Sequence, residues 1–545
     1  MFFIIRINVI ISYIEVMTMN KILILYKSKY GATKKYAYML KKEIACDVFD
    51  IKDYQKGMFD KYELVIFASA IYASGISGLK VLKKNYAELK NKKVIIFCVG
   101  ASPYDKKAFD EIKDYTQEQI DKLVYESAKI IYENAVPLAK LAVEETGLGK
   151  FEDKICKNTD TAAVFWDYLK DKKSVGIINE IPEQGIIEVA HPIGVIGAVT
   201  PATNPTVTPL GNFMHALKGK NALVITPAPR AEKTTTDTVN LIREALVKNG
   251  APADLIQVIQ DTTIDKSREL MESCDLVIAT GGPGLTKAAY SSGTPAYGVG
   301  PGNPPVILDK GYDLQEAAKM TFIAVGSDNG ILCDGDNLLL YPQETEKDFF
   351  VALKQEGILV YEEKADVEKF RAALFSEGKI NSGLVGKDAH VIAEAAGFDI
   401  PADTKVIAVK IEGVGKEDIM CREIMGPIVV LKSYETFEEA VDMAVRNMEE
   451  SGGIGHTAGL FTNDQEHIRY AGERIPVARL LVNQPTPDAW GPATNGLSPA
   501  VSEGCGTWGN NILAGNVDYI HMLNVSKIAL PLDVKAPDAA EIFGK

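Results

Sequence analysis

The chain has 545 residues, of which 46% are hydrophobic and 24% are charged, and its formal net charge is -14 at pH 7. This composition is typical of a globular protein, and the length predicts three or four domains of about 150 residues each. The acidic balance disfavours a nucleic-acid partner, which requires a basic face.

Residues 1–14 are apolar, but Arg6 and Asn8 interrupt them, so the run is shorter than the about 18 apolar residues of a membrane span. Neither a Lys-rich start nor a small-residue cleavage site is present, which disfavours a signal peptide. A clean strand pattern begins only at Met19. We therefore interpret residues 1–18 as a non-native or dispensable extension, and we expect no membrane partner.

Seven cysteines are scattered along the chain, without a CxxC pair or a Cys/His cluster. This pattern disfavours a disulfide framework and a zinc site, and it is typical of a reducing compartment. We expect a cytoplasmic protein without a bound metal.

Residues 19–112 alternate between apolar runs and charged helical stretches, which is the pattern of a parallel sheet covered by helices. Apolar runs occupy residues 22–26, 64–68 and 94–99, and helical patterns occupy 34–44 and 79–89. Loops at the carboxyl ends of such strands bind ligands. Hydroxyl groups, a glycine and an aromatic ring there form a candidate site for a phosphate group and a flat cofactor at Ser28, Gly31, Thr33 and Tyr72.

These loops resemble those of the flavodoxin-like family over about ninety residues. The resemblance implies a doubly wound α/β domain, truncated because residues 106–115 turn charged and helical instead of continuing the sheet. Two interpretations remain open. The domain either binds FMN or is a remnant without flavin.

A second doubly wound pattern follows, large enough to bind a dinucleotide. A long amphipathic helical stretch covers residues 117–145, and another covers 234–249. Strand patterns occupy residues 175–178, 185–190, 194–200, 221–226, 276–279 and 296–299.

Cys333 ends a segment that begins with Gly326 and precedes the apolar run 338–341. This arrangement presents a thiol at the start of a strand, where a substrate carbonyl is able to meet it. A cysteine is a nucleophile only as its thiolate. The alternative, an inert buried cysteine, is common for a lone thiol in a large protein.

An ordered set of motifs over some four hundred residues resembles the aldehyde dehydrogenase superfamily, in its CoA-acylating branch. The motifs are residues 200–205, 279–284, 287–293, 298–303, Asp328-Asn329-Gly330-Ile331-Leu332-Cys333, 455–459 and 504–509. Segments 469–472, 482–485 and 524–528 are most similar to succinate-semialdehyde (succinyl-CoA-reducing) members.

The resemblance implies an α/β protein with a Rossmann-like NAD(P)-binding domain at residues 113–325, completed by 486–530. A catalytic domain at 326–485 carries the cysteine, and 531–545 form a tail. It also implies a homodimer or homotetramer. Every candidate catalytic residue lies at or beyond Asn204, so we expect residues 1–115 to be dispensable for the reaction.

In this reading Cys333 attacks an aldehyde and forms a thioester once hydride has left. Asn204 and the Cys333 backbone N–H donate to the oxyanion, and His456 exchanges protons with the CoA thiol. The alternatives are a turn-stabilising asparagine before Pro205 and a structural histidine.

The dinucleotide is expected to lie on two loops and on a glycine-rich helix start. The implied residues are Thr200, Pro201, Pro227, Arg230, Gly281, Gly282, Gly284, Gly300 and Gly302. Arg230 either favours NADP over NAD or pairs with Glu232.

Hydrolytic relatives place a glutamate base near residues 297–303, where this chain has Gly298, Val299, Gly300, Pro301, Gly302 and Asn303. Without an activated water, the acyl group must pass to another nucleophile, and the thiol of coenzyme A is the natural one. The alternatives are an acetaldehyde or butyraldehyde dehydrogenase (acylating) and a catalytically weak oligomeric scaffold.

Asp334 directly follows the cysteine, and Asp336 lies two residues beyond it. A carboxylate beside a thiolate raises the pKa of the thiol by repulsion between like charges. We therefore expect slower reaction, or activity shifted to higher pH.

Overall fold

The structure, a computed structural model, describes residues 21–28, 32–72, 75–76, 83–90, 92–99 and 110–544. The chain divides into two compact units, Met1–Pro103 and Tyr104–Lys545. Of the predicted FMN residues, Gly31 lies outside the described residues, and the side chain of Tyr72 is not described.

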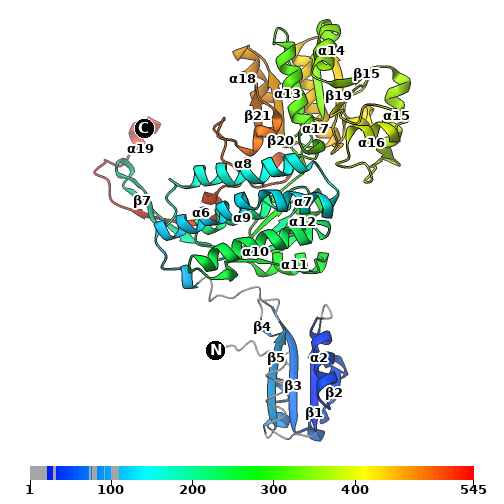
Figure 1. Ribbon diagram of the computed structural model, residues 1–545. Coiled ribbons are helices and arrows are strands. Elements are labelled where there is room, and N and C mark those ends of the chain that lie inside the picture. The colour runs from blue at the N-terminus through cyan, green and yellow to red at the C-terminus, as the bar shows by residue number, and fades with distance from the viewer. Residues whose placement is uncertain are drawn as a thin grey trace. The chain divides into compact units, whose positions relative to one another are not determined.

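The first unit is a parallel sheet with helices on its faces (Figure 1), which confirms the flavodoxin-like fold. Its strands are β1 (Ile22–Lys27), β2 (Asp47–Asp50), β3 (Leu64–Tyr72) and β5 (Lys93–Val99), in the order β2-β1-β3-β5, and β4 (Gly75–Ile76) pairs antiparallel with β3. Alternate residues of β1 face opposite sides. Ile22 and Ile24 pack against α2 (Ala32–Glu43), whereas Leu23 and Leu25 pack near Phe59.

The second unit begins with a helical layer over a five-stranded parallel sheet in the order β10-β9-β8-β11-β12. The strands are β8 (Val195–Thr200), β9 (Ala222–Pro227), β10 (Ile256–Val258), β11 (Leu276–Thr280) and β12 (Ala296–Val299). The helices are α6 (Gln117–Glu133), α7 (Ala135–Thr146), α8 (Phe151–Leu169), α9 (Val207–Lys218), α10 (Glu232–Lys248), α11 (Ile264–Ser273) and α12 (Pro283–Tyr290). Residues of α9 are buried on every side, because neighbouring helices and the sheet both cover it.

The helical stretch predicted at 117–145 is two helices. Asn134 has φ -110° and ψ 19°, which lies outside the helical region and ends α6 before α7 begins. At the other end, Thr116 and Gln119 form a reciprocal capping box that fixes where α6 starts.

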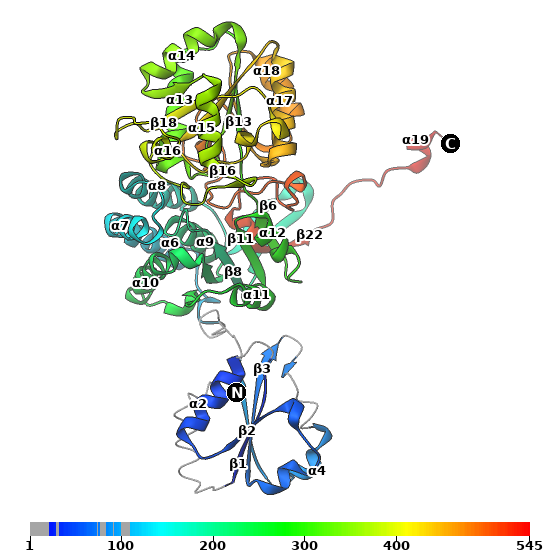
Figure 2. The ribbon, with the colours of Figure 1, turned by 90° about the vertical axis from the view of Figure 1, so that its right-hand side faces the viewer.

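A seven-stranded parallel sheet in the order β15-β18-β19-β14-β13-β20-β21 forms the core of the catalytic region. The strands are β13 (Pro305–Leu308), β14 (Leu338–Pro342), β15 (Ile358–Tyr361), β18 (Val406–Lys410), β19 (Ile428–Tyr434), β20 (Gly455–Phe461) and β21 (Val477–Val482). The helices are α13 (Leu314–Gly326), α14 (Glu346–Gln355), α15 (Lys364–Leu374), α16 (Ala389–Ala395), α17 (Phe437–Ser451) and α18 (Gln465–Arg474). They cover both faces of this sheet (Figure 2).

The predicted domain boundary at residue 325 differs from this topology. β13 pairs with β14 and β20, so it belongs to the second sheet rather than to the cofactor-binding one. The chain passes from one sheet to the other between Val299 and Pro305. An apolar strand pattern alone does not reveal which sheet the strand joins.

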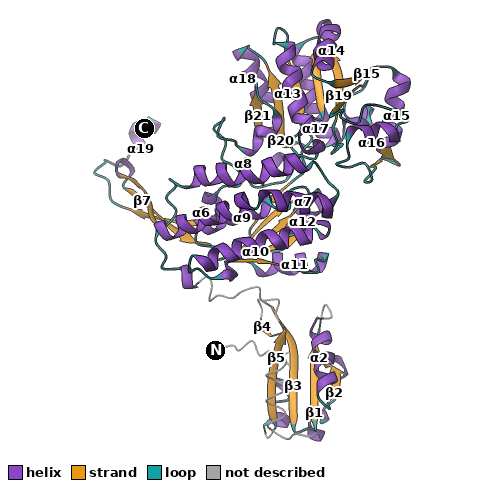
Figure 3. Cartoon of the chain, viewed as in Figure 1, coloured by secondary structure: helices purple, strands orange, loops and turns teal. Residues whose placement is uncertain are grey.

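A three-stranded antiparallel sheet, β22-β7-β6, extends from the helices of this unit (Figure 3). It consists of β6 (Gly176–Ile181), β7 (Ile186–Pro192) and β22 (Leu523–Ala529), with most of β22 exposed. A segment ending in α19 (Ala539–Phe543) follows. Among the described residues, no helix is long and apolar enough to cross a membrane.

The core of the second unit begins before residue 115. Ile112 is fully buried in its core, and Lys220 Nζ donates to the carbonyl oxygen of Lys113 at 2.7 Å. We predict that a protein starting at Asp110 is soluble and retains acyl-CoA reduction, whereas one starting at Thr116 is less stable by about 2–4 kcal/mol, because Ile112 is lost from the core. Urea denaturation and an NAD(P)H oxidation assay on both proteins measure this. Loss of activity in the folded Asp110 protein would show that the first unit contributes to the reaction.

Candidate active site

The loop before Cys333 is held in a left-handed conformation. Asp328, Asn329 and Gly330 have φ values of 49°, 56° and 65°, which is uncommon for residues with a Cβ. The Asn329 side-chain amide fixes the turn by donating to the Gly386 carbonyl at 3.0 Å and to Asp388 Oδ1 at 2.8 Å. Gly330 is required, because a Cβ there would overlap the backbone of Gly426.

Cys333 lies between this turn and β14, as the sequence predicts, and its side chain is accessible to solvent. The loop after β12 packs directly on it. A Cβ on Gly302 would overlap the Cys333 carbonyl and lie 3.3 Å from His456 Nδ1, and one on Gly300 would lie 3.7 Å from Cys505 Sγ. The structure therefore gives Gly302 a packing role at the thiol loop, and the predicted contact of both glycines with the cofactor stays a prediction.

Asp328 joins the thiol loop to helix α8 through two lysines one turn apart. Lys154 Nζ and Lys157 Nζ lie 2.6 Å and 2.5 Å from Asp328 Oδ2, and the Lys150 backbone N–H donates to Asp328 Oδ1 at 2.9 Å. Burial acts to raise the pKa of Asp328, but the two ammonium groups outweigh it and lower that pKa. Asp328 is therefore a fixed, fully buried carboxylate.

The same lysines hold the loop that carries Asn204. Lys154 Nζ donates to the Thr203 carbonyl at 2.6 Å, and Lys157 Nζ donates to Asn204 Oδ1 at 2.9 Å. The Asn204 carbonyl accepts the Thr208 N–H at 3.2 Å in the first turn of α9. Asn204 thus lies at a helix N-terminus, where developing negative charge is stabilised.

His456 is buried, and both of its ring nitrogens face protein groups. Nδ1 is 2.9 Å from Thr457 Oγ1, and Nε2 is 3.9 Å from Glu503 Oε2. Burial lowers the pKa of His456 well below its usual value, and the charge of Arg479 lowers it further. The imidazole is therefore neutral at physiological pH and is only a weak proton acceptor.

Arg479 on β21 anchors the loops around His456. Its guanidinium donates to the carbonyls of His456 and Gly504 at 2.9 Å and 3.0 Å, and it lies 3.4 Å from Glu503 Oε2. It is 3% exposed, so its charge acts with little screening by water.

Carboxyl groups dominate the electrostatics of Cys333. Desolvation by the surrounding protein raises the pKa of the Cys333 thiol well above its ordinary value. The carboxyl groups of Asp334, Glu503 and Glu423 raise the pKa further, and Arg479 opposes them. The direction expected from Asp334 alone is thus correct, although two carboxyl groups distant in sequence contribute as well.

Asp334 and Glu503 form a buried carboxyl pair, each about 5% exposed or less. Burial and the charge of Glu503 raise the pKa of Asp334 well above its usual value. Burial also raises the pKa of Glu503, while Arg479 and a hydrogen bond with Asp334 act to lower it. Because the two groups share one buried site, the pair resists carrying two negative charges.

The sequence suggested that Asp336 acts together with Asp334 to raise the pKa of the Cys333 thiol, but Asp336 is not among the groups that raise it most. Its Oδ1 accepts a hydrogen bond from the Thr486 hydroxyl, while Oδ2 is buried and has no hydrogen-bond partner among the described residues. Burial raises the pKa of Asp336 to about 7, and the bond from Thr486 opposes this rise.

The carboxyl ends of β8, β9 and β11 provide a surface that fits a dinucleotide. Buried hydroxyls of Thr200 and Thr226 have no partner among the described protein groups. Gly282, at the start of α12, carries no side-chain cap, and the space above Gly282 and Gly284 is open. Free N–H groups at a helix start, without side chains in the way, suit a pyrophosphate.

The predicted residues Pro201, Pro227, Gly281 and Arg230 lie on the same loops. Thr200 and Pro227 are register partners at the ends of β8 and β9, and Gly281 precedes the start of α12. The Arg230 guanidinium donates to the Thr146 carbonyl. Glu232 accepts instead from the backbone N–H groups of Asp261 and Thr262 at 2.7 Å and 2.9 Å, so the structure does not support the predicted Arg230–Glu232 pair.

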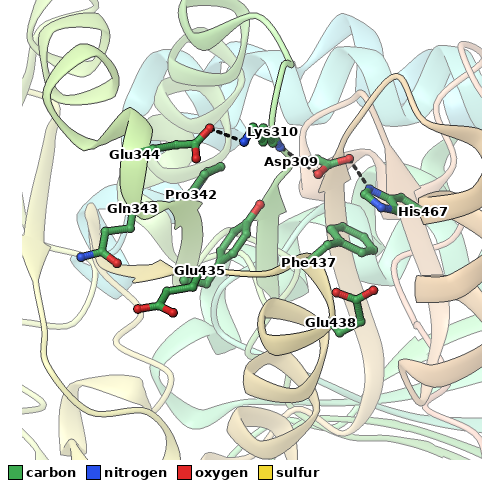
Figure 4. A pocket seen from close by; sticks show the side chains of 10 residues that line it. Asp309, Lys310, Pro342, Gln343, Glu344, Glu435, Phe437, Glu438 and His467 are labelled. Atoms are coloured by element: carbon green, nitrogen blue, oxygen red, sulfur yellow. Dashed lines mark hydrogen bonds and ion pairs between the residues drawn. The ribbon is translucent and has the colours of Figure 1, made fainter.

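A cavity of about 440 Å³ lies at the opposite end of the second sheet (Figure 4). Pro342 and Gln343 line it at the carboxyl end of β14, whereas Cys333 precedes the amino end of that strand. Asp309 accepts from His467 Nδ1 at 2.7 Å within it, and Lys310 pairs with Glu344 at 2.6 Å. A five-residue strand spans about 17 Å, so this cavity is separate from the thiol.

A sequence profile of the aldehyde dehydrogenase family matches residues 101–363 and 411–496. Succinate-semialdehyde dehydrogenase (acetylating) of Clostridium kluyveri is 46% identical over 440 residues, which are 81% of this chain and 97% of that protein. The chain belongs to the aldehyde dehydrogenase family.

Further matches place this aldehyde dehydrogenase among the acylating members. The crystal structure of an acetylating aldehyde dehydrogenase from Geobacillus thermoglucosidasius is similar with a TM-score of 0.76 and 36% identity, over 79% of this chain and 96% of that one. Sulfoacetaldehyde dehydrogenase of an Acholeplasma species is 38% identical over 446 residues, 81% of this chain and 92% of that protein. A flavodoxin domain profile matches residues 23–135.

The sequence did not reveal several groups of this aldehyde dehydrogenase site. They are Lys154, Lys157, Asp328, Glu423, Arg479 and Glu503. Two lysines three residues apart on a helix were the only local signal, and that spacing is also common on solvated faces. Asp328, Glu423 and Glu503 become recognisable only when the fold brings distant loops together.

We predict that Asp334→Ser lowers the pKa of the Cys333 thiol by about one pH unit, because it removes the nearest carboxyl group. Iodoacetamide alkylation of Cys333 against pH measures the midpoint. Asp336→Asn is the matched control. It also removes a carboxyl group from this loop, but the Asp336 side chain contacts Thr486, so a smaller shift is expected. An unchanged or raised midpoint in the Ser variant would mean that Asp334 determines the shape of the loop. Its charge would then not be what raises the pKa of the Cys333 thiol.

The raised pKa of Asp336 also predicts that the stability of the folded protein depends on pH. Its pKa in the folded protein is about 7, against about 3.9 when unfolded. Because the folded value is raised, the free energy of unfolding falls as pH rises from about 4 to about 7, by on the order of 4 kcal/mol for this group. Urea denaturation between pH 4.5 and 7.5 should show a shallower fall for Asp336→Asn than for the unmodified protein. Equal slopes would show that Asp336 is ionised in the folded state at low pH.

Proposed function

We propose that this enzyme interconverts succinyl-CoA and succinate semialdehyde through a thioester on Cys333. Relatives named for succinate semialdehyde and sulfoacetaldehyde, both small aldehydes with an anionic end, support this substrate class. The observation that carries the proposal is an accessible thiol on a rigid left-handed loop, tied through Asp328 and Lys157 to the amide of Asn204.

In the reductive direction, the Cys333 thiolate attacks the carbonyl carbon of the acyl-CoA. The Asn204 amide and the Cys333 backbone N–H donate to the oxyanion, and such a donor is worth about 3 kcal/mol of the barrier. The carbon–sulfur bond to coenzyme A then breaks, and the leaving thiolate takes up a proton. The acyl group stays on Cys333.

Thr200, Pro227 and the start of α12 would hold NAD(P)H, which would supply the hydride that reduces this thioester. The resulting hemithioacetal on Cys333 collapses, which releases the aldehyde and restores the thiolate. His456 is neutral and buried, and it keeps its proposed role in proton exchange only as an acceptor. Glu423, with its pKa raised by burial to about 8, is mostly protonated at neutral pH and is a poor base for activating water.

The finer assignments belong to the same proposal. Apolar side chains on the outer sheet and the segment after it, Ile177, Val525, Ile528, Leu530 and Leu532, are exposed, which supports the expected homodimer or homotetramer. We propose a cytoplasmic location. FMN binding by the first unit, and the choice between NAD and NADP, stay predictions that cofactor titrations decide.

We predict that Cys333→Ala reduces acyl-CoA reduction by several factors of ten, because the covalent nucleophile is lost. Mass spectrometry of the intact protein after succinyl-CoA should show an acyl adduct on the unmodified protein and none on the variant. The matched control is Cys156→Ala, which removes an exposed thiol and should retain both. Rates with succinyl-, acetyl- and butyryl-CoA rank the substrates. Turnover by Cys333→Ala above about a tenth of the normal rate would refute the mechanism.

A further inference from the structure

We propose that Lys157 is a positioning residue that holds the Asn204 amide with its NH₂ group turned toward the reacting carbonyl. The inference rests on the proposed role of Asn204 as an oxyanion donor.

The direction of the amide follows from hydrogen-bond chemistry. An ammonium group has three donors and no acceptor. The Asn204 atom that lies 2.9 Å from Lys157 Nζ must therefore be the oxygen. The NH₂ group then occupies the other branch of the amide, away from Lys157. Without this contact, the two orientations of the amide would differ little in energy, and one of them would present an oxygen to the oxyanion.

Lys157 is itself held in place. Its second contact, 2.5 Å to Asp328 Oδ2, is to a carboxylate with no exposed surface. Asp328 is fixed in turn by the backbone N–H of Lys150 and by its own N–H, which donates to Asp153 Oδ2 at 2.7 Å. Helix α8, which carries Asp153 and Lys157, contacts the turn Ser327–Gly330 directly.

Asp328 lies five residues before Cys333, so one ammonium group connects both halves of the site. It sets the amide of Asn204 relative to the loop that carries the thiol. Lys154 provides an internal comparison. It makes the same contact with Asp328 at 2.6 Å, but its other bond goes to the backbone carbonyl of Thr203 and not to a side chain. Of these two lysines, Lys157 is the one that is able to select the orientation of the Asn204 amide.

The test compares two reactions of Cys333. Acylation by acyl-CoA develops an oxyanion, whereas alkylation by iodoacetamide displaces iodide at a methylene carbon and develops none. Lys157→Met should slow single-turnover acylation by about 10- to 100-fold. The alkylation rate at the high-pH plateau, where the thiol is fully ionised, should change by less than about twofold. Lys154→Met removes an equal charge from Asp328 and should slow acylation much less. Lys157→Arg retains a donor and should recover part of the loss.

A double-mutant cycle with Asn204→Ala completes the test. If Lys157 acts through Asn204, adding Lys157→Met to Asn204→Ala causes little further loss of acylation. Additive losses, equal losses in Lys154→Met and Lys157→Met, or a parallel fall in alkylation would each overturn the inference while leaving the thioester mechanism intact. Full acylation by Asn204→Ala would instead overturn the oxyanion role of Asn204, and the absence of any acyl adduct in the unmodified protein would overturn the proposed function.

Discussion

The buried carboxylate of Asp328 is the interaction on which the site depends. A charge without exposed surface is costly unless it is paired, and here two ammonium groups and a backbone N–H satisfy it. Each partner belongs to α8 or to the turn before it, and each lysine makes a second bond to the loop at Thr203 and Asn204. Neutralising one charge therefore ties together the loops of the proposed nucleophile and the proposed oxyanion donor, which are 129 positions apart in the printed sequence.

A second cluster, of carboxyl groups around the Cys333 thiol, disfavours a negative charge on the sulfur instead of stabilising one. Asp334, Glu503 and Glu423 disfavour the thiolate, and Arg479 only partly compensates. The reactive form of Cys333 is therefore scarce in the free enzyme. A nucleophile with a high pKa is also the stronger one once it is ionised. Cys333 is thus seldom ionised, but its thiolate is intrinsically more reactive. The site depends on contacts with the substrate to raise the fraction of thiolate.

Sequence reasoning was successful where local pattern and ordered motifs carry the information. Continuous apolar runs predicted β1, β3 and β5 within a few residues. The motif around Cys333 was located correctly between a turn and β14. Reasoning failed where the cause is tertiary. The amphipathic helical pattern continues through Asn134, yet the helix ends at this residue. The apolar pattern of β13 is compatible with a strand of either sheet. Glu503 and Arg479 meet only because Arg479 lies on the strand beside β20 and His456.

The absence of a carboxylate after β12 has a steric cause as well as a chemical consequence. A side chain at Gly302 would overlap the Cys333 carbonyl, and a Cβ at Gly298 would come within 3.0 Å of Thr286 and Tyr290. A glutamate at either position would therefore displace the thiol loop or α12. The close packing at these two positions therefore disfavours a base that activates water at Gly298 and excludes one at Gly302. A thioester formed on Cys333 then survives until another nucleophile or a hydride reaches it, which is the condition that transfer to and from coenzyme A requires.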